Sequence, residues 1–179
     1  NGFDEFSGFL AGCVDYYSHI FYWGMALLII WQFMKFFDRI NDGEHWVGEN
    51  LASWHVSIGS VLLVLIVLRL IWAVRQKNKR PEQDPATALL VKAGHGLLYL
   101  GMLALPITGL MIMIGNGYGW DPFGIVLIAG GGAEIDWLAT LGSVHSLIAW
   151  SLLILVIGHA GIALLHHFVK KDGVLQRML

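Results

Sequence analysis

The segment VHSLIAWSLLILVIGHAGIALLHHFVKK, residues 144–171, decides how this chain folds. It is apolar enough to lie in a lipid bilayer, yet it contains His145, His159, His166 and His167. Burying a polar ring in a membrane costs free energy, so such residues are rare there unless they have a function. The histidines are therefore either tolerated in a membrane helix or bind a ligand.

The composition of the whole chain agrees with a membrane protein. Of its 179 residues 56% are hydrophobic and 13% are charged, whereas about a quarter of the residues in a typical soluble domain are charged. Four apolar runs of about 18 to 23 residues are each long enough to cross a hydrocarbon core of roughly 30 Å as a helix. Barrel strands would alternate polar and apolar residues, which these runs do not. The runs cover residues 20–37, 56–74, 96–114 and 147–169.

We therefore predict an all-α membrane protein. Residues 1–179 are expected to form a single domain, a bundle of four transmembrane helices over about 19–37, 55–75, 93–115 and 143–169.

The distribution of charge predicts which ends of these helices face the cytoplasm. Lysine and arginine gather between the second and third runs and after the fourth, as they do in cytoplasmic segments. The other two connections are acidic or lack basic residues, and the net charge of −2 argues against a nucleic-acid partner. We expect a multi-pass protein in contact with lipid, with both termini inside. Four tryptophans are expected near the outer interface: Trp46, Trp54, Trp120 and Trp137.

Histidines recur at matching depths in the predicted helices. His145 and His159 are 14 residues apart, so in a helix they lie near one face and about 21 Å apart along the axis. His19 opens the first helix at its inner end, and His55 opens the second at its outer end. Two histidines thus fall at each depth, which is the arrangement of two metal centres stacked across the membrane.

Haem suits such pairs better than other metal sites do. A haem iron has four porphyrin nitrogens and needs only two axial ligands, so one histidine from each of two helices is sufficient. Structural zinc takes four protein ligands, and a di-iron site in a helix bundle needs inward glutamates, which the apolar runs lack. The pattern therefore predicts two b-type haems.

Several residues have more than one interpretation. Any single histidine in a span can be a hydrogen-bonded packing residue, and His95 fits a ligand, a quinone-site residue or an interface residue equally well. His45 is expected to be solvated in the outer connection, and Gly130 to Gly132 to form a turn. Small residues allow either a macrocycle or a neighbouring helix to approach the backbone. Those in the predicted interior are Gly24, Gly59, Gly101, Gly109, Gly158 and Gly161.

Three segments resemble the bacterial cytochrome b561 family of the inner membrane. They are SWHVSIGSVLLVLIVLRLIW (53–72), AGHGLLYLGMLALPITGLMIM (93–113) and LGSVHSLIAWSLLILVIGHAGIALLHHFVKKDGVLQRM (141–178). The histidine spacing in the last is also similar to that in cytochrome b subunits of formate dehydrogenases and nickel-iron hydrogenases. The resemblance implies that His19 and His159 hold the inner haem iron and that His55 and His145 hold the outer one. Depth alone predicts the same pairs.

The resemblance also implies transmembrane electron transfer to ubiquinone. In the members most similar to this chain, superoxide is oxidised at the outer face and quinone is reduced near the inner face. By this likeness His166 and Ser18 belong to a quinone site. Arg69 is then placed either to pair with an inner-haem propionate or to reach the inner headgroups. His167, turned about 100° from His166, is expected to be an interfacial residue without a special role.

Two other functions fit the same pattern. The chain can be the cytochrome b anchor, or quinone-reducing subunit, of a larger dehydrogenase or hydrogenase that docks on the outer loop. It can also be a four-helix module without redox activity, whose histidines pack or bind another metal. The outer connections are acidic, which does not favour steering of an anion such as superoxide. Their acids are Asp42, Glu44, Glu49, Asp121, Glu134 and Asp136.

Overall fold

The computed structural model describes residues 21, 23–40, 42, 44–75 and 88–170. Ser18 and His19 therefore lie outside the described residues, as do the basic connection over 76–87 and the chain from residue 171 onward. Within the described ranges, all regular secondary structure is helical, apart from one isolated bridge between Trp120 and Ile128.

Helices follow one another in the order of the apolar runs. Residues 23–33 are helical and continue into a 3-10 helix, η1 (Met34–Arg39). A short segment with α2 (Trp46–Asn50) and η3 (Ala52–Trp54) leads into α3 (His55–Arg75). The second half contains α4 (Ala88–Gly115), η5 (Pro122–Gly124), α5 (Asp136–Gly142), α6 (His145–Leu165) and a π-helical end, η6 (His166–Lys170).

Three stretches of the described chain are long and apolar enough to cross a membrane: Trp46–Arg75, Ala88–Gly115 and Asp136–Val169. Their apolar side chains face outward, with Val74 72% exposed and Leu89 81% exposed. An apolar surface of this extent is stable in lipid and not in water. The prediction of a helical membrane protein is confirmed. Helix 23–33 is the described part of a further predicted span, so the count of four stays a prediction.

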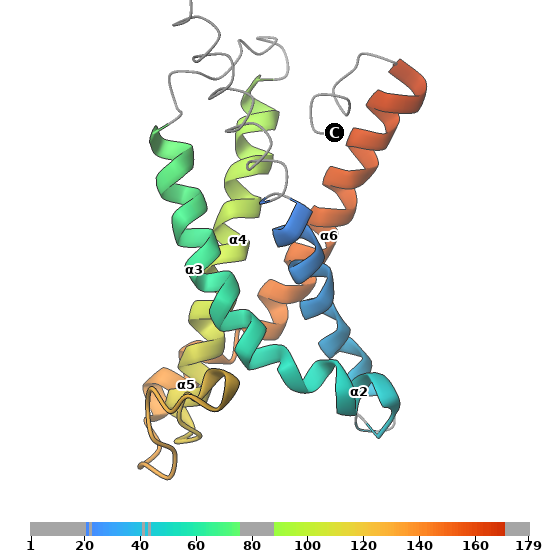
Figure 1. Ribbon diagram of the computed structural model, residues 1–179. Coiled ribbons are helices and arrows are strands. Elements are labelled where there is room, and N and C mark those ends of the chain that lie inside the picture. Colours follow the sequence, from blue (N-terminus) through green and yellow to red (C-terminus); the bar gives the residue numbers. More distant parts are fainter. Residues whose placement is uncertain (1–20, 22, 41, 43, 76–87, 171–179) are drawn as a thin grey trace, which may run out of the picture.

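The long helices enclose a central space. In Figure 1, α3 and α4 lie side by side, and the first helix (blue) runs alongside α6. Met25, Leu62 and Ile66 form a buried cluster between the first helix and α3, with Met102 and Leu103 of α4 packed against it. This cluster holds three helices together about half-way along α3. We call the end that carries α2 and α5, at the bottom of Figure 1, the outer end, following the predicted orientation.

The connection between α4 and α5 folds back onto α3. Trp120 pairs with Ile128, and its indole Nε1 donates to Ser60 Oγ at 2.9 Å, while the Phe123 amide donates to Ser57 Oγ at 2.9 Å. Gly131, at φ +80°, donates its amide to the Gly117 carbonyl. The stretch over Gly130 to Gly132 is therefore a turn, as expected, and the connection closes the outer end of α3.

Gly142 is required where α5 packs on α4. A Cβ at this position would lie 2.8 Å from the backbone nitrogen of Ile112, a group that cannot move away as a flexible side chain can. Gly142→Ala should lower the unfolding temperature in detergent, since overpacking costs about 1–3 kcal/mol. Gly96→Ala, where nothing lies within 4 Å, should leave it unchanged or raise it. Equal unfolding temperatures for Gly142→Ala and the unaltered chain would contradict this packing.

Candidate functional site

Two of the predicted histidines meet at the outer end. His55 is the first residue of α3 and His145 is the first residue of α6. Their ring centroids are 6.1 Å apart and their planes are inclined at 82°. The short helix η3 leads directly into α3, and α5 is followed two residues later by α6. Both short helices lie at the same end of the molecule, so α3 and α6 begin at the same level.

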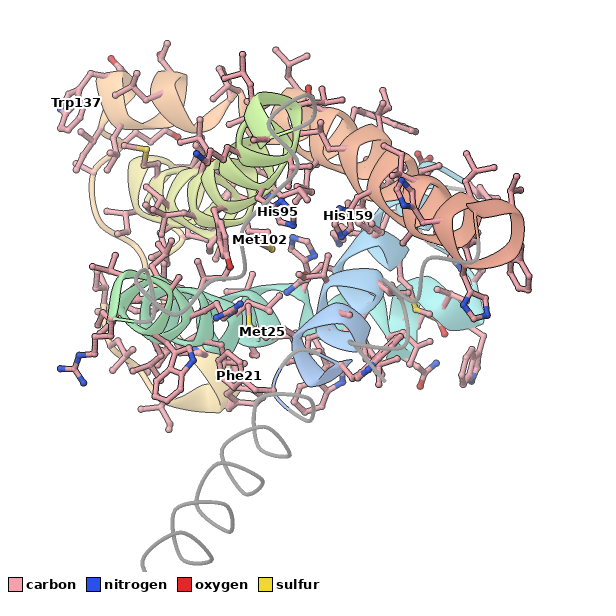
Figure 2. The ribbon with its side chains drawn as sticks, turned by 90° about the horizontal axis from the view of Figure 1, so that it is seen from above. Phe21, Met25, His95, Met102, Trp137 and His159 are labelled. Atoms are coloured by element: carbon pink, nitrogen blue, oxygen red, sulfur yellow. The ribbon has the colours of Figure 1, made fainter. Side chains whose placement is uncertain are left out.

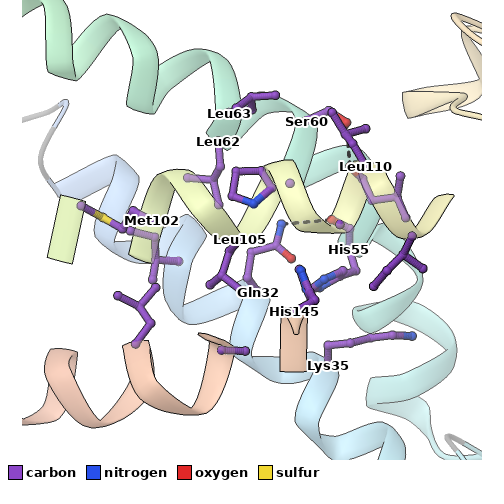
Figure 3. A pocket seen from close by; sticks show the side chains of 18 of the residues that line it. Gln32, Lys35, His55, Ser60, Leu62, Leu63, Met102, Leu105, Leu110 and His145 are labelled. Carbon is purple, nitrogen blue, oxygen red and sulfur yellow. Dashed lines mark hydrogen bonds between the residues drawn. The ribbon is translucent and has the colours of Figure 1, made fainter. Parts of the chain in front are cut away.

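A cavity of about 530 Å³ opens beside these two rings. Figure 3 shows it between the first helix, α3, α4 and α6. Its walls are mostly aliphatic, with a small set of polar groups, as in many cofactor pockets of 300–1,000 Å³. The polar side chains are Gln32, Lys35, His55, Ser60, His145 and Ser146.

Two glycines give the cavity its width. A Cβ at Gly109 would lie 3.3 Å from Cε1 of His145, and one at Gly59 would lie 3.3 Å from Nε2 of Gln32. Both glycines line the cavity, so larger residues would press on the groups that face it. Gly101 instead packs against Leu152, which is the helix-packing role that the sequence also allowed.

His55 has a buried nitrogen that lacks a partner in the described chain. Its Nδ1 makes no hydrogen bond there, although its backbone carbonyl accepts one from Gln32 Nε2 at 3.0 Å. Gln32 Oε1 is also buried and unpaired among the described residues. Such groups cost free energy unless something supplies the missing partner. A ligand, or a change in the position of the Gln32 side-chain amide, would supply the missing partner of the His55 ring.

A second pair of histidines lies further along α6. The rings of His95 and His159 have centroids 5.4 Å apart and planes inclined at 79°. In Figure 2 both point into the space between the helices, close to Met102. Nδ1 of His95 lies 2.7 Å from the carbonyl oxygen of Val91, so it must donate its hydrogen there, which leaves Nε2 as an acceptor. His19, the partner that the sequence predicted for His159, lies outside the described residues.

The separation of the outer pair is compatible with a shared metal ion. Imidazole–metal bonds are about 2 Å long and a ring centre lies about 1 Å beyond its nitrogen, so two imidazoles on opposite sides of one ion have centres about 6 Å apart. The observed distance is 6.1 Å. Among the described residues, no three His, Cys, Asp or Glu side chains gather as a metal site.

The structure places the other predicted residues as follows. The Arg69 guanidinium lies 5.9 Å from the centre of the Tyr99 ring, a cation–π contact that the sequence analysis did not anticipate. His166 and His167 are half-buried in η6, and His167 packs its ring on Phe168.

His45 was expected to be only solvated, but it caps α2. Its Nδ1 accepts from the Gly48 amide and its Nε2 donates to the Phe37 carbonyl.

Sequence reasoning missed four polar residues near the outer pair. Gln32 and Lys35 line the cavity from the first helix and η1, and Lys35 forms an ion pair with Asp38. Thr108 contacts His145 from α4. A polar residue inside an apolar run was the available signal for Gln32 and Thr108. Lys35 and Asp38 gave no comparable signal in the sequence, because charged residues at the end of a membrane span are common.

The fold and the two histidine pairs define a class: a helical membrane protein whose histidines face an interior space of cofactor size. The comparisons with known proteins agree. The family model described as prokaryotic cytochrome b561 matches residues 15–179, nearly the whole chain. The chain belongs to this family, whose members are cytochromes b that transfer electrons in the membrane.

Curated relatives point the same way. The chain is 33% identical to cytochrome b561 homolog 2 of Escherichia coli over 179 aligned positions, which cover 96% of this chain and 90% of the relative. It is 38% identical to a probable superoxide oxidase, CybB, of Yersinia pestis, over 70% of this chain and 72% of that protein. It is 28% identical to cytochrome b562 of Cereibacter sphaeroides over 88% of this chain and 89% of that one.

The outer pair predicts a selective loss of haem. If His55 and His145 together hold one haem, His55→Ala and His145→Ala should each remove that haem, because each takes away one of its two imidazoles, and should leave any second haem in place. Pyridine haemochrome analysis of the purified variants gives the count. His45→Ala is the matched control, since His45 is also at the outer end but caps α2. Loss of a haem in only one of the two variants would contradict the pairing.

Proposed function

We propose that this protein binds two b haems and transfers electrons across the membrane from an outer donor to ubiquinone. The observation that carries the proposal is the His55–His145 pair beside an apolar cavity, with His159 on the same helix at the other depth. When bound, such haems supply one-electron redox centres whose iron is held by two imidazoles. The chain's part is to place these imidazoles, keep water away from them and supply protons to the quinone with the electrons.

For the inner haem we propose His19 and His159 as the ligands. The support is the histidine spacing and the family likeness, and His159 faces the space between the helices. His95 is the competing partner, because its ring lies 5.4 Å from that of His159 and its Nε2 is an acceptor. With His19 as the ligand, His95 is the neighbour that packs against the His159 ring.

This assignment is testable by comparing three variants. His159→Ala and His19→Ala should remove the inner haem, whereas His95→Ala should leave two haems per chain with a shifted inner spectrum. Haem content and reduced-minus-oxidised spectra measure this directly. If His95→Ala removes the inner haem and His19→Ala does not, the ligand pair is His95 with His159.

The outer donor is proposed to be superoxide. The relative named as a probable superoxide oxidase supports this, and so does Lys35, a cation in the wall of the outer cavity. Lys35 is paired with Asp38, so the local potential depends on both charges. The reaction balances when two superoxide anions become two molecules of dioxygen while one ubiquinone takes up two electrons and two protons. The inner end must therefore supply two protons for each quinone.

His166 and Ser18 are proposed to serve the quinone. His166 lies in η6, at the inner end of α6 and about two helix turns beyond His159. A histidine at this place can form a hydrogen bond to a quinone oxygen and pass a proton to it. Ser18, which lies outside the described residues, would contribute a hydroxyl beside His19.

One measurement tests donor and acceptor together. Liposomes that contain the protein and ubiquinone should reduce the quinone when superoxide is generated outside, and superoxide dismutase should abolish the reaction. His166→Ala should slow the rate by about 100-fold, the usual contribution of a proton-transfer group, with both haem spectra retained. His167→Ala is the matched control and should be near normal. Full activity in His166→Ala would remove this residue from the quinone site.

A specific observation also favours a partner subunit. The outer connection exposes an apolar tip, with Ile125 63% and Val126 66% exposed. Such a patch suits docking of another protein, as expected of a cytochrome b anchor. Purification in mild detergent decides between the two functions. A large partner at equal stoichiometry would replace superoxide as the donor, whereas the chain alone with superoxide-driven quinone reduction supports the stand-alone enzyme.

A further inference from the structure

Thr108 is a buried polar residue of α4 that touches a proposed haem ligand. It is 8% exposed. Its Oγ1 lies 2.8 Å from the Ala104 carbonyl oxygen, 3.0 Å from the Leu105 carbonyl oxygen and 3.0 Å from Nδ1 of His145. The side chain thus links the α4 backbone to the first residue of α6.

The hydrogens in this contact can be assigned from chemistry alone. A carbonyl oxygen only accepts, and a threonine hydroxyl has one hydrogen. We place that hydrogen toward one of the two carbonyl oxygens, because two contacts between oxygens without any hydrogen would otherwise result. A neutral His145 then carries its hydrogen on Nδ1 and donates it to Oγ1, which leaves the lone pair on Nε2.

The next residue on α4 gives the ring its room. Gly109 has no side chain, and a Cβ there would lie 3.3 Å from Cε1 of His145. Thr108 and Gly109 thus contact the ring from α4, where the Leu105 backbone is a further hydrogen-bond partner of His145. A metal-binding histidine is commonly held in this way through the nitrogen that does not bind the metal.

We propose that Thr108 is a positioning residue that fixes the tautomer of His145 and lowers the reduction potential of the outer haem. This inference rests on the proposed function where it concerns haem, but the tautomer does not depend on it. An acceptor at Nδ1 increases the electron density at Nε2, and a stronger donor stabilises the oxidised iron more than the reduced iron. Nothing comparable pairs with Nδ1 of His55 in the described chain, so the effect comes from one side of the site.

The test replaces the hydroxyl and keeps the shape. Thr108→Val should raise the midpoint potential of the outer haem, and a tenfold change in the relative stability of its two oxidation states corresponds to about 59 mV. Thr108→Ser retains the hydroxyl and should stay close to the unaltered protein. Ser151→Ala is the matched control, because Ser151 makes the same kind of bond to a helix carbonyl, that of Leu147, but has no hydrogen bond to a histidine of the described chain. The inner haem should be unaffected in all three.

Each outcome decides the proposal. An unchanged outer potential in Thr108→Val would overturn it. If Thr108→Val loses the outer haem, retention in Thr108→Ser supports the proposal, whereas equal loss in both variants overturns it. Nitrogen-15 NMR of labelled histidine in the haem-free chain gives a separate readout: His145 should be protonated at Nδ1, and Thr108→Val should weaken that preference. A chain that binds no haem but shows this tautomer would refute the proposed function and leave the Thr108 interaction standing.

Discussion

The structure depends on one constraint: a polar ring inside a membrane helix must have a partner. His55 and His145 begin two long helices at the same level, and their rings face each other beside an apolar cavity. The helices cannot slide relative to one another without separating this pair. The buried cluster of Met25, Leu62 and Ile66 joins α3 to the first helix and α4. The histidine contact and this cluster therefore hold α3 to different neighbours.

The two histidine pairs differ in how many groups of the described chain contact and hold their rings. At the outer level, α4 provides Thr108 and Gly109, while the first helix provides Gln32, so two further helices support the two rings. At the inner level, His95 and His159 are more exposed, and His95 is held by a bond within its own helix. Among the described residues, the outer pair thus has more supporting groups than the inner pair.

Sequence predicted the helical membrane class because apolar runs of sufficient length have few alternatives in lipid. It also predicted that His55 and His145 share one depth, since the helical rise fixes depth along a span. It left His95 open, because depth does not say which helices are neighbours. The roles of Thr108 and Gln32 depend on side-chain direction, and the capping role of His45 depends on the local turn. Such details follow from tertiary contacts and not from periodicity.

The central claim, that His55 and His145 are axial partners, is tested most directly by low-temperature electron paramagnetic resonance of the oxidised protein. Their planes are inclined at 82°, so the outer haem should give the strongly anisotropic low-spin signal of nearly perpendicular imidazoles. That signal should vanish in His145→Ala while a second low-spin signal persists. A high-spin outer haem in the unaltered protein, or an anisotropic signal that survives in His145→Ala, would contradict the account.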